Sequence, residues 1–330
     1  MNRHRGRIAV LGAGAWGTAL AMQATRAGGI ATLWARDAAR ADTIVRAHAN
    51  ERYLPGVALP MTLGITASLE EALCNARLVL LVVPAQHLRA VVGALPKALP
   101  PLLVCAKGVE QGSLALPLEV LAELRPDAVA GVLSGPNFAH EVAAGLPAAA
   151  VVASSDAGLR ETADQALATA AFRLYGSEDP VGVQVGGAAK NVIAIAAGIV
   201  TGAGLGENAR AALITRGVAE LSRLTLALGG KAETAAGLSG IGDLLLTATG
   251  AGSRNTSLGM ALGQGRSAAE VLAGRAGVTE GMATAPALVA RAAAAGVELP
   301  ICAAVAALLA GRLDVPGAVA QLLARPRRVE

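Results

Sequence analysis

The lysines of this chain are few, and two of them are placed where an amine could act on a bound molecule. Of the 28 basic side chains only four are lysines: Lys97, Lys107, Lys190 and Lys231. An arginine stays protonated in proteins, whereas a lysine can release its proton when its surroundings favour the neutral form. Lys97 and Lys231 stand among prolines or glycines typical of surface loops, but Lys107 and Lys190 lie in apolar, glycine-rich stretches. The sequence therefore marks Lys107 and Lys190 as the candidates for proton chemistry.

Lys190 is predicted to lie on an apolar helix face that calls for a partner. Its neighbours one helical turn away are glycine, isoleucine and alanine. An unpaired ammonium there would be costly, so a carboxylate or a ligand must face it. Asp243 is likewise an isolated acid in an apolar stretch, and a Lys190–Asp243 pair is the economical solution. Such a pair is either a structural ion pair or an acid/base centre, and the pattern alone leaves both open.

Two further groups of residues could bind an anion. Lys107 follows one apolar run of strand length, and Gly135 and Asn137 follow another, so all three are expected at strand ends. Lys107 would direct a cation toward a ligand, unless it is a surface lysine whose stem alone is buried. The Ser-Arg-Asn stretch at 253–255 offers a guanidinium fork and an amide, which suit a phosphate. The simpler alternative for that stretch is a helix cap beside a solvated arginine.

A glycine motif near the N-terminus predicts a dinucleotide site. Residues 8–11 form an apolar run and are followed by Gly12, Gly14 and Gly17 in the spacing Gly-x-Gly-x-x-Gly. Residues 18–27 contain neither proline nor glycine and are predicted to be helical. In this setting the first glycine allows a tight turn, the second lets a pyrophosphate approach the backbone, and the third lets helix and strand pack closely. A glycine-rich turn that binds nothing is the alternative.

The elements that carry these residues alternate between strand and helix through the first half of the chain. Apolar runs predict strands at 8–11, 31–36, 63–67, 78–83, 102–106, 128–133, 148–153 and 172–175, with helices between them. This alternation is typical of a doubly wound, mostly parallel sheet, whose ligands bind beyond the carboxyl ends of the strands. After Gly176 no strand is predicted, and helices are expected at 183–201, 208–228, 255–263, 268–273, 283–295 and 301–310.

The 330 residues suit about two domains of ordinary size. The expected fold class is an α/β N-terminal doubly wound Rossmann-type sheet plus an all-α C-terminal domain. We place the dinucleotide-binding domain at residues 1–179 and the helical substrate and catalytic domain at 180–330. The helical domain is expected to close over the ligand edge of the sheet and form a cleft.

Composition limits the class of protein. Hydrophobic residues make up 54 % of the chain, but much of that is alanine. No segment offers the ~18 uninterrupted apolar residues of a spanning helix, and the basic N-terminus has no cleavable signal pattern, so we expect a cytoplasmic protein without membrane insertion. The three cysteines are far apart and indicate neither disulfides nor a metal site. A net charge of +4 without interleaved aromatics is weak evidence for nucleic acid, and a phosphorylated small molecule would suit this charge equally well. We expect a small-molecule partner and no nucleic acid.

Eight stretches match one family in order and spacing. Through residues 12–21, 106–108, 134–139, 187–194, 211–217, 240–244, 253–255 and 278–281 the chain resembles bacterial NAD(P)-dependent sn-glycerol-3-phosphate dehydrogenase over essentially its whole length. The resemblance implies reduction of dihydroxyacetone phosphate to sn-glycerol 3-phosphate, the backbone of glycerophospholipids. It also implies NADP or NAD as cofactor, no metal, and a homodimer.

The resemblance implies roles for individual residues. Lys190 would be the catalytic acid/base, and Asp243 would orient its ammonium. The substrate site would contain Lys107, Gly135, Asn137, Lys190, Asp243, Ser253, Arg254 and Asn255. The cofactor site would contain the motif glycines Gly12, Gly14 and Gly17 together with Ala15, Trp16, Arg36, Lys107, Ala139, Arg254, Val278 and Glu280. Asn137 stands where serine or threonine is usual, which puts its side-chain contact in question, although an amide can still donate. Ala15 replaces a frequent serine but keeps a backbone N–H.

The implied reaction is hydride transfer to the ketone carbon, with a proton given by Lys190. The sequence leaves open whether nearby cations and burial lower the pKa of Lys190, or whether Asp243 and the substrate phosphate raise it. One rival is a related dehydrogenase acting on another phosphorylated or carboxylated alcohol. The other is a nucleotide-sensing protein without turnover, against which the presence of both Lys190 and Asp243 argues.

The end of the second strand bears on the choice of nicotinamide cofactor. In dinucleotide folds an acid ~20 residues past the glycine motif binds the ribose 2′-hydroxyl of NAD, and an arginine there accommodates the 2′-phosphate of NADP. Arg36 and Asp37 are both present. Asp37 fits the N-cap of the following helix, which would occupy its carboxylate, whereas Arg36 has no such local partner. We therefore expect a preference for NADPH with residual NADH activity.

Overall fold

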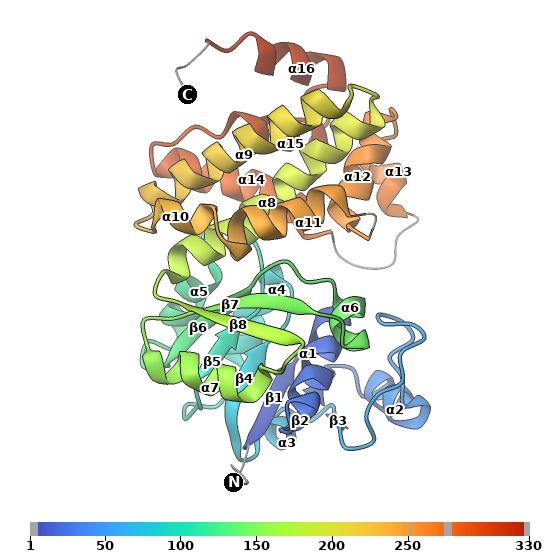
Figure 1. Cartoon of the computed structure of the whole chain (residues 1–330), viewed down its shortest axis with the longest axis vertical. Coiled ribbons are helices and arrows are strands. Elements are labelled where there is room, and N and C mark those ends of the chain that lie inside the picture. Colours follow the sequence, from blue (N-terminus) through green and yellow to red (C-terminus); the bar gives the residue numbers. More distant parts are fainter. Residues whose placement is uncertain (1–5, 251, 274–278, 327–330) are drawn as a thin grey trace. The chain divides into compact units, whose positions relative to one another are not determined.

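A computed structural model describes residues 6–250, 252–273 and 279–326 of the chain. The chain divides into two compact units. The first, the sheet unit, comprises Met1–Lys107 and Pro117–Pro180, and the second, the helical unit, comprises Gly108–Leu116 and Val181–Glu330. All the strands lie in the sheet unit (Figure 1), as far as the described residues go.

The apolar runs of the first half form one eight-stranded sheet. Its strands are β1 (Arg7–Leu11), β2 (Ile30–Trp34), β3 (Gly64–Thr66), β4 (Ala76–Leu81), β5 (Leu102–Val104), β6 (Ala130–Ser134), β7 (Ala148–Ala153) and β8 (Phe172–Ser177). They are ordered β3-β2-β1-β4-β5-β6-β7-β8, and only β6 and β7 pair antiparallel. The predicted mostly parallel sheet is confirmed. Because β1 to β6 run parallel, the residues that follow these strands meet at one edge of the sheet.

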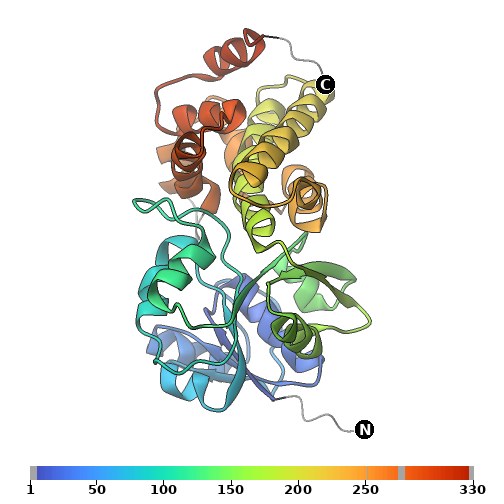
Figure 2. The ribbon, with the colours of Figure 1, turned by 90° about the vertical axis from the view of Figure 1, so that its left-hand side faces the viewer.

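Helices cover both faces of this sheet, which explains why its central strands are nearly continuous apolar runs. They are α1 (Ala15–Arg26), α2 (Ala38–Ala47), α3 (Leu69–Leu73), α4 (Ala85–Gly93), α5 (Pro117–Leu124), α6 (Ala139–Ala144) and α7 (Ala157–Leu167). Figures 1 and 2 show α1, α6 and α7 on one face and α4 and α5 on the other.

The predicted strand ends were wrong by up to two residues at the ligand edge, and pairing explains the difference. Leu11 pairs with Trp34 on one side and with Leu81 on the other. Because β1 ends at Leu11, where the glycine turn begins, its neighbours lose their partner there. Strands β2 and β4 therefore end before the predicted limits of 36 and 83. Conversely, β8 extends two residues beyond 175, since Ser177 pairs with Ala153.

The helical unit contains α8 (Pro180–Gly202), α9 (Glu207–Ala227), α10 (Ala232–Ala235), the π-helix η1 (Leu238–Gly242), α11 (Asp243–Thr249), α12 (Arg254–Gly263), α13 (Ala268–Ala273), α14 (Glu280–Ala294), α15 (Pro300–Leu309) and α16 (Val315–Leu323). Six of these correspond to predicted helices. The elements α10, η1, α11 and α16 were not predicted, because they are short and contain or adjoin glycine or proline. Helix α8 runs through the middle of this unit (Figures 1 and 2), and every residue from Gly182 to Val200 is buried.

Helix α8 has the length and mean hydropathy of a spanning segment, although it has no ~18 uninterrupted apolar residues. Among the described residues it is the one helix long and apolar enough to cross a membrane. Its polar residues Gln184, Lys190 and Asn191 interrupt the apolar run without lowering its mean hydropathy below that of a spanning segment. The whole of its most apolar window is buried by the other helices, which is the position of a core helix.

The segment Gly108–Leu116 follows β5 and belongs to the helical unit. Its Val109 and Leu116 are buried in the core of that unit, and Gln111 Nε2 donates a hydrogen bond to the Ala283 carbonyl at 3.3 Å. The predicted domain of residues 1–179 does not provide for this excursion. Apolar side chains in a loop do not reveal from sequence which core will bury them.

Candidate active site

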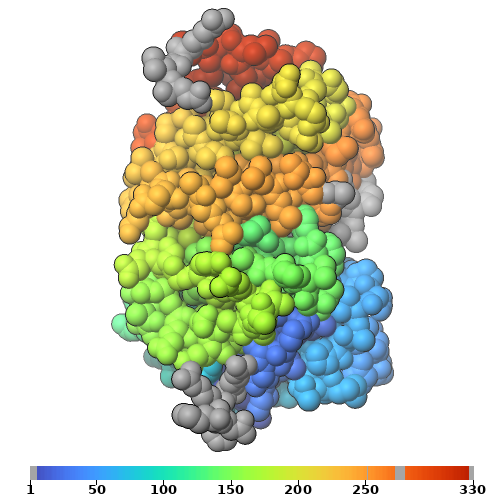
Figure 3. Space-filling view, viewed as in Figure 1, coloured from blue at the N-terminus to red at the C-terminus, as the bar shows by residue number. Residues whose placement is uncertain are grey.

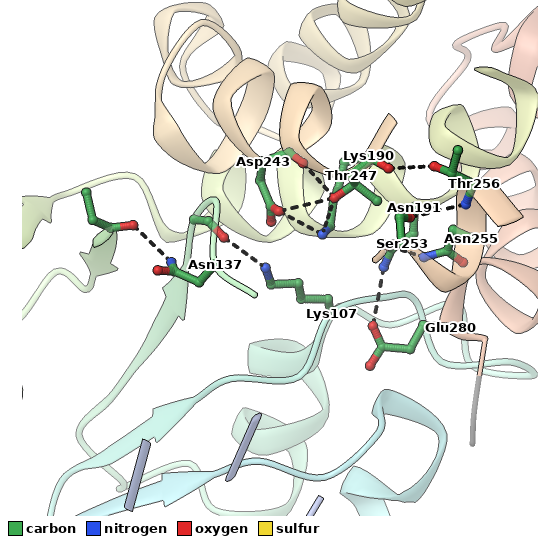
Figure 4. A network of polar contacts seen from close by, with 12 residues as sticks. Lys107, Asn137, Lys190, Asn191, Asp243, Thr247, Ser253, Asn255, Thr256 and Glu280 are labelled. Atoms are coloured by element: carbon green, nitrogen blue, oxygen red, sulfur yellow. Dashed lines mark hydrogen bonds and ion pairs between the residues drawn. The ribbon is translucent and has the colours of Figure 1, made fainter. Parts of the chain in front are cut away.

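Lys190 lies in the buried middle of α8, and its amine is held by two oxygen atoms. Nζ donates to Asp243 Oδ1 at 2.7 Å and to Thr247 Oγ1 at 2.9 Å (Figure 4). The side chains of Lys190 and Asp243 are only 10 % and 2 % exposed. The predicted Lys190–Asp243 pair is therefore present. A buried ammonium in a fixed position, next to a carboxylate, is a group that can give or take a proton at a defined point.

Close backbone packing brings Asp243 to Lys190. The π-helix η1 ends directly before Asp243, and its residue Ser239 passes over Gly186, one turn before Lys190 on α8. A Cβ atom added at Gly186 would lie 2.6 Å from the Ser239 carbonyl oxygen, so a glycine is required for this approach. Single π-turns beside α-helices occur frequently at functional sites.

Thr247 is a site residue that the sequence analysis missed. It lies one turn beyond Asp243 on α11, and its Oγ1 donates to the Asp243 carbonyl oxygen at 2.6 Å. A hydroxyl that donates in this way keeps lone pairs free to accept from Lys190 Nζ. The available signal was spacing, because residues four apart on a helix share one face.

A second network ties together three helices of the same unit. Asn255 Nδ2 on α12 donates to Asn191 Oδ1 on α8 at 2.8 Å, and Asn191 Nδ2 donates to Glu280 Oε2 on α14 at 3.3 Å (Figure 4). The Gly281 N–H closes the network by donating to Asn255 Oδ1 at 3.2 Å. The sequence analysis began this helix at 283, but here Glu280 begins it, because Asn255 satisfies one of its free N–H groups. The network unites Asn255 and Glu280 through Asn191, which the sequence analysis did not assign.

Ser253 and Arg254 open α12. Ser253 is its N-cap, with Oγ accepting from the Thr256 N–H at 3.2 Å, and Arg254 is exposed in the first turn. The structure thus contains the simpler alternative to a phosphate site, a helix cap beside an exposed arginine. It is compatible with anion binding, since a guanidinium in the first turn of a helix stands next to free backbone N–H groups.

In the sheet unit the glycine motif forms the turn that a dinucleotide requires. Gly12 has a φ of +125°, and an added Cβ there would lie 2.3 Å from the Val82 carbonyl oxygen. A Cβ at Gly17 would lie 1.8 Å from the Gly12 carbonyl oxygen, whereas one at Gly14 would meet no atom within 4 Å. Gly14 therefore faces open space at the N-terminus of α1, which has no side-chain cap. The three positions fit a turn that packs tightly on two sides and leaves room for a pyrophosphate on the third.

Lys107, Gly135 and Asn137 follow β5 and β6 at the same edge of the sheet. Lys107 Nζ donates to the Gly135 carbonyl oxygen at 3.3 Å, and Asn137 Nδ2 donates to the Ala149 carbonyl oxygen at 2.9 Å (Figure 4). Asn137 thus uses an N–H to hold β7. Among the described residues nothing bonds to Asn137 Oδ1 or Ser134 Oγ, although both atoms are buried. These two atoms fit a polar ligand at this edge.

The remaining residues of the predicted cofactor site fall on the same unit, with three exceptions. Ala15 and Trp16 form the first turn of α1, Ala139 begins α6, and Arg36 is exposed just beyond β2. Arg254 and Glu280 belong to the helical unit. Val278 lies outside the described residues.

Cys74, Cys105 and Cys302 are free, and burial raises the pKa of the Cys105 and Cys302 thiols. No group of three or more histidine, cysteine, aspartate or glutamate side chains is arranged to hold a metal ion within the described ranges.

Known proteins match both units. The model of the NAD-dependent glycerol-3-phosphate dehydrogenase N-terminus matches residues 7–160, and that of the C-terminus matches residues 179–320. A glycerol-3-phosphate dehydrogenase (NAD(P)+) of Rhodospirillum rubrum is 54 % identical over 333 residues, covering 100 % of this chain and 95 % of the relative. The like-named protein of Gluconobacter oxydans is 53 % identical over 81 % of each chain.

A solved structure resembles the whole fold. The crystal structure of glycerol-3-phosphate dehydrogenase from Coxiella burnetii, 38 % identical, matches with a TM-score of 0.93 over 97 % of this chain and 99 % of that chain. Together with the matched residues of both units, this likeness assigns the protein: the chain belongs to the NAD-dependent glycerol-3-phosphate dehydrogenase family.

Proposed function

We propose that this chain reduces dihydroxyacetone phosphate to sn-glycerol 3-phosphate with NADPH or NADH. The observation that carries the proposal is the buried amine of Lys190, held by Asp243 and Thr247 at 2.7 and 2.9 Å in a chain of this family. A reductase of a ketone needs one proton donor at the carbonyl oxygen. A buried lysine held by a carboxylate and a hydroxyl meets that need without a metal.

A nicotinamide cofactor, when bound, would supply the hydride for the ketone carbon. Lys190 Nζ donates a proton to the carbonyl oxygen, which becomes the hydroxyl of the product. In the reverse direction neutral Lys190 takes the hydroxyl proton. Asp243 and Thr247 keep Nζ in place during both directions, because each accepts a hydrogen bond from it.

The phosphate of the substrate is bound in this proposal by Arg254, with help from the network of Asn255. Interactions with this remote group supply binding energy that positions the ketone at Lys190. The further substrate residues are Lys107, Gly135, Asn137 and Ser253. The orphaned oxygens Asn137 Oδ1 and Ser134 Oγ suit a substrate hydroxyl as acceptors.

The dinucleotide would lie on the turn of Gly12, Gly14 and Gly17, with its pyrophosphate at the N–H groups of Ala15 and Trp16. Arg36, Lys107, Ala139, Arg254, Val278 and Glu280 complete the proposed cofactor site. We propose NADPH as the preferred form, because Asp37 is occupied: its Oδ1 accepts the Arg40 N–H at 2.7 Å as N-cap of α2. We further propose a cytoplasmic homodimer that feeds glycerophospholipid synthesis.

The test is oxidation of reduced cofactor in the presence of dihydroxyacetone phosphate. The absorbance of the reduced nicotinamide measures its progress. The related-dehydrogenase alternative is tested in the opposite direction, as reduction of oxidised cofactor by the alcohols 6-phosphogluconate and 3-hydroxyacyl-CoA. Turnover with either of these and none with dihydroxyacetone phosphate would overturn the proposal. Cofactor binding without turnover on any of the three would favour the nucleotide sensor.

A further inference from the structure

An arginine that is not part of the proposed cofactor site links the end of β2 to the glycine turn. Arg40 lies in the first turn of α2, directly after the position where dinucleotide folds recognise the adenosine ribose. Its Nη2 donates to the Ala13 carbonyl oxygen, inside the Gly12–Gly14 turn. The guanidinium therefore lies between the place of the ribose and the place of the pyrophosphate.

The Tyr53 ring lies near this cation and near a second arginine. The Arg40 guanidinium carbon lies 4.1 Å from the centre of the Tyr53 ring, and that of Arg52 lies 5.5 Å from the same centre. These distances are within the range of cation–π attraction. Asn50 anchors this segment to the turn, because its Nδ2 donates to the Ala13 carbonyl oxygen at 3.0 Å and to Thr18 Oγ1 at 2.8 Å.

The charges around this cluster favour an additional anion. Asp37 accepts the backbone N–H of Arg40, and Glu51 Oε2 accepts that of Gly56 at 3.1 Å, so both acids are engaged by backbone. No hydrogen bond satisfies the buried Nε of Arg40 in the described part of the chain. Burial is the largest influence on the Arg40 guanidinium and lowers its pKa, yet an arginine remains protonated at neutral pH. A partly buried cation with an unsatisfied N–H gains from a phosphate oxygen.

We propose that Arg40, stacked on Tyr53 and assisted by Arg52, binds the 2′-phosphate of NADP and thereby sets the cofactor preference of this chain. The proposal rests on the proposed function only in that a dinucleotide occupies the glycine turn. It adds Arg40, Arg52 and Tyr53 to Arg36 as specificity-determining residues. The segment that carries Arg52 and Tyr53 belongs to the light-blue surface of the sheet unit in Figure 3, and Arg52 is exposed.

The test measures binding of two fragments, 2′,5′-ADP and 5′-AMP, to the full-length protein by calorimetry. The two probes share adenine, ribose and the 5′-phosphate and differ only in the 2′-phosphate. Neither carries nicotinamide, so activity plays no part. We expect wild type to bind 2′,5′-ADP at least about tenfold more tightly than 5′-AMP, as a charge-assisted contact allows. Arg40→Met, which keeps an apolar stem on Tyr53, is expected to remove most of that ratio, and Arg40→Lys to retain part of it.

Arg46→Met is the matched control, because Arg46 is an exposed arginine in the last turn of the same helix. It should leave the ratio unchanged. Equal weakening of both probes by Arg40→Met would make Arg40 a positioning residue for the turn and overturn the proposal. A ratio that falls with Arg36→Met but not with Arg40→Met would overturn it as well. Thermal unfolding of each variant checks the fold, and the Arg40→Lys variant keeps the test decisive if Arg40→Met does not fold.

The outcome separates this inference from the proposed function. Equal binding of both probes by wild type, together with reduction of dihydroxyacetone phosphate by NADH, would overturn the inference and leave the function intact. Binding of neither probe, with no turnover on either cofactor, would overturn both.

Discussion

Lys190 Nζ lies 2.7 Å from Asp243 Oδ1, although the two residues are separated by 53 positions in the chain. Both side chains are buried, so the pair exists without the screening that weakens ion pairs at a surface. Replacing a buried pair by apolar residues is often harmless, whereas removing one partner costs about 3–5 kcal/mol. The presence of the pair is therefore weak evidence that it stabilises the fold. What the pair does for the proposed reaction is to hold the Lys190 amine at a fixed point.

Replacement of Lys190 tests that amine directly. Lys190→Ala should reduce turnover by about two to four orders of magnitude, the usual contribution of a general acid or base, and leave cofactor affinity nearly intact. Lys190→Arg should be almost as poor, since arginine keeps the charge but gives up its proton reluctantly. Steady-state kinetics measure turnover, and titration of the bound cofactor's fluorescence measures affinity. Near-normal turnover of Lys190→Arg would mean that only the charge matters.

Thr247 is expected to affect turnover by positioning the Lys190 amine. Thr247→Val keeps the shape of the side chain but removes the oxygen that accepts from Nζ, so turnover should fall by about tenfold to a hundredfold. Thr249→Val is the control, because Thr249 is an exposed residue of the same helix whose hydroxyl also bonds the backbone one turn earlier. Similar kinetics of the two variants would remove Thr247 from the catalytic centre.

Arg254 is expected to recognise the phosphate of the substrate. Arg254→Ala should mainly raise the Michaelis constant for dihydroxyacetone phosphate, because it removes a charge-assisted contact that can be bidentate. The preference for dihydroxyacetone phosphate over dihydroxyacetone should shrink accordingly. Arg266→Ala, an exposed arginine beyond the end of α12, serves as control. If the preference is unchanged in Arg254→Ala, the phosphate is bound elsewhere, with Lys107 as the next candidate.

Glu220 should make stability depend on pH. This buried residue of α9 accepts the N–H groups of Ile301 at 2.6 Å and Cys302 at 3.2 Å, which opens α15. Burial raises the pKa of the Glu220 carboxyl, and the hydrogen bonds from the backbone lower it only in part. Because the folded state then binds the proton more tightly than the unfolded chain, this contribution to stability is present below about pH 4.3 and is lost as pH rises through the folded pKa.

The variant Glu220→Gln carries no titrating group and should lack this slope. The melting temperature of wild type minus that of Glu220→Gln is expected to decrease steadily as pH rises from the ordinary glutamate value toward neutrality. Glu161→Gln, at an exposed position of α7, should show a much smaller trend. A difference that stays constant or grows with pH would mean that the two backbone N–H groups favour the charged carboxylate more than burial opposes it.

The sequence by itself determined the features that depend on local chemistry. The glycine spacing after an apolar run fixed the turn at Gly12, because only glycine tolerates a φ of +125° with a carbonyl oxygen so close. The alternation of apolar runs fixed the sheet class, since strands covered on both faces must be apolar throughout. The isolation of Lys190 and Asp243 in apolar stretches predicted their pairing, because neither charge could be buried alone.

Only the tertiary structure decided the features that depend on partners far along the chain. Thr247 is recognised as a site residue only in the structure, where η1 packs on Gly186 and α11 follows it toward α8. No local helix or strand propensity encodes this packing. Asn191 acquired its role from Asn255 and Glu280, which lie 64 and 89 positions away. Arg40 met Ala13 and Tyr53 because α2 folds back along the glycine turn. Long-range contacts of this kind form when the apolar faces of two distant elements pack together. A single sequence shows which face of each element is apolar, but it does not show which other element will cover that face.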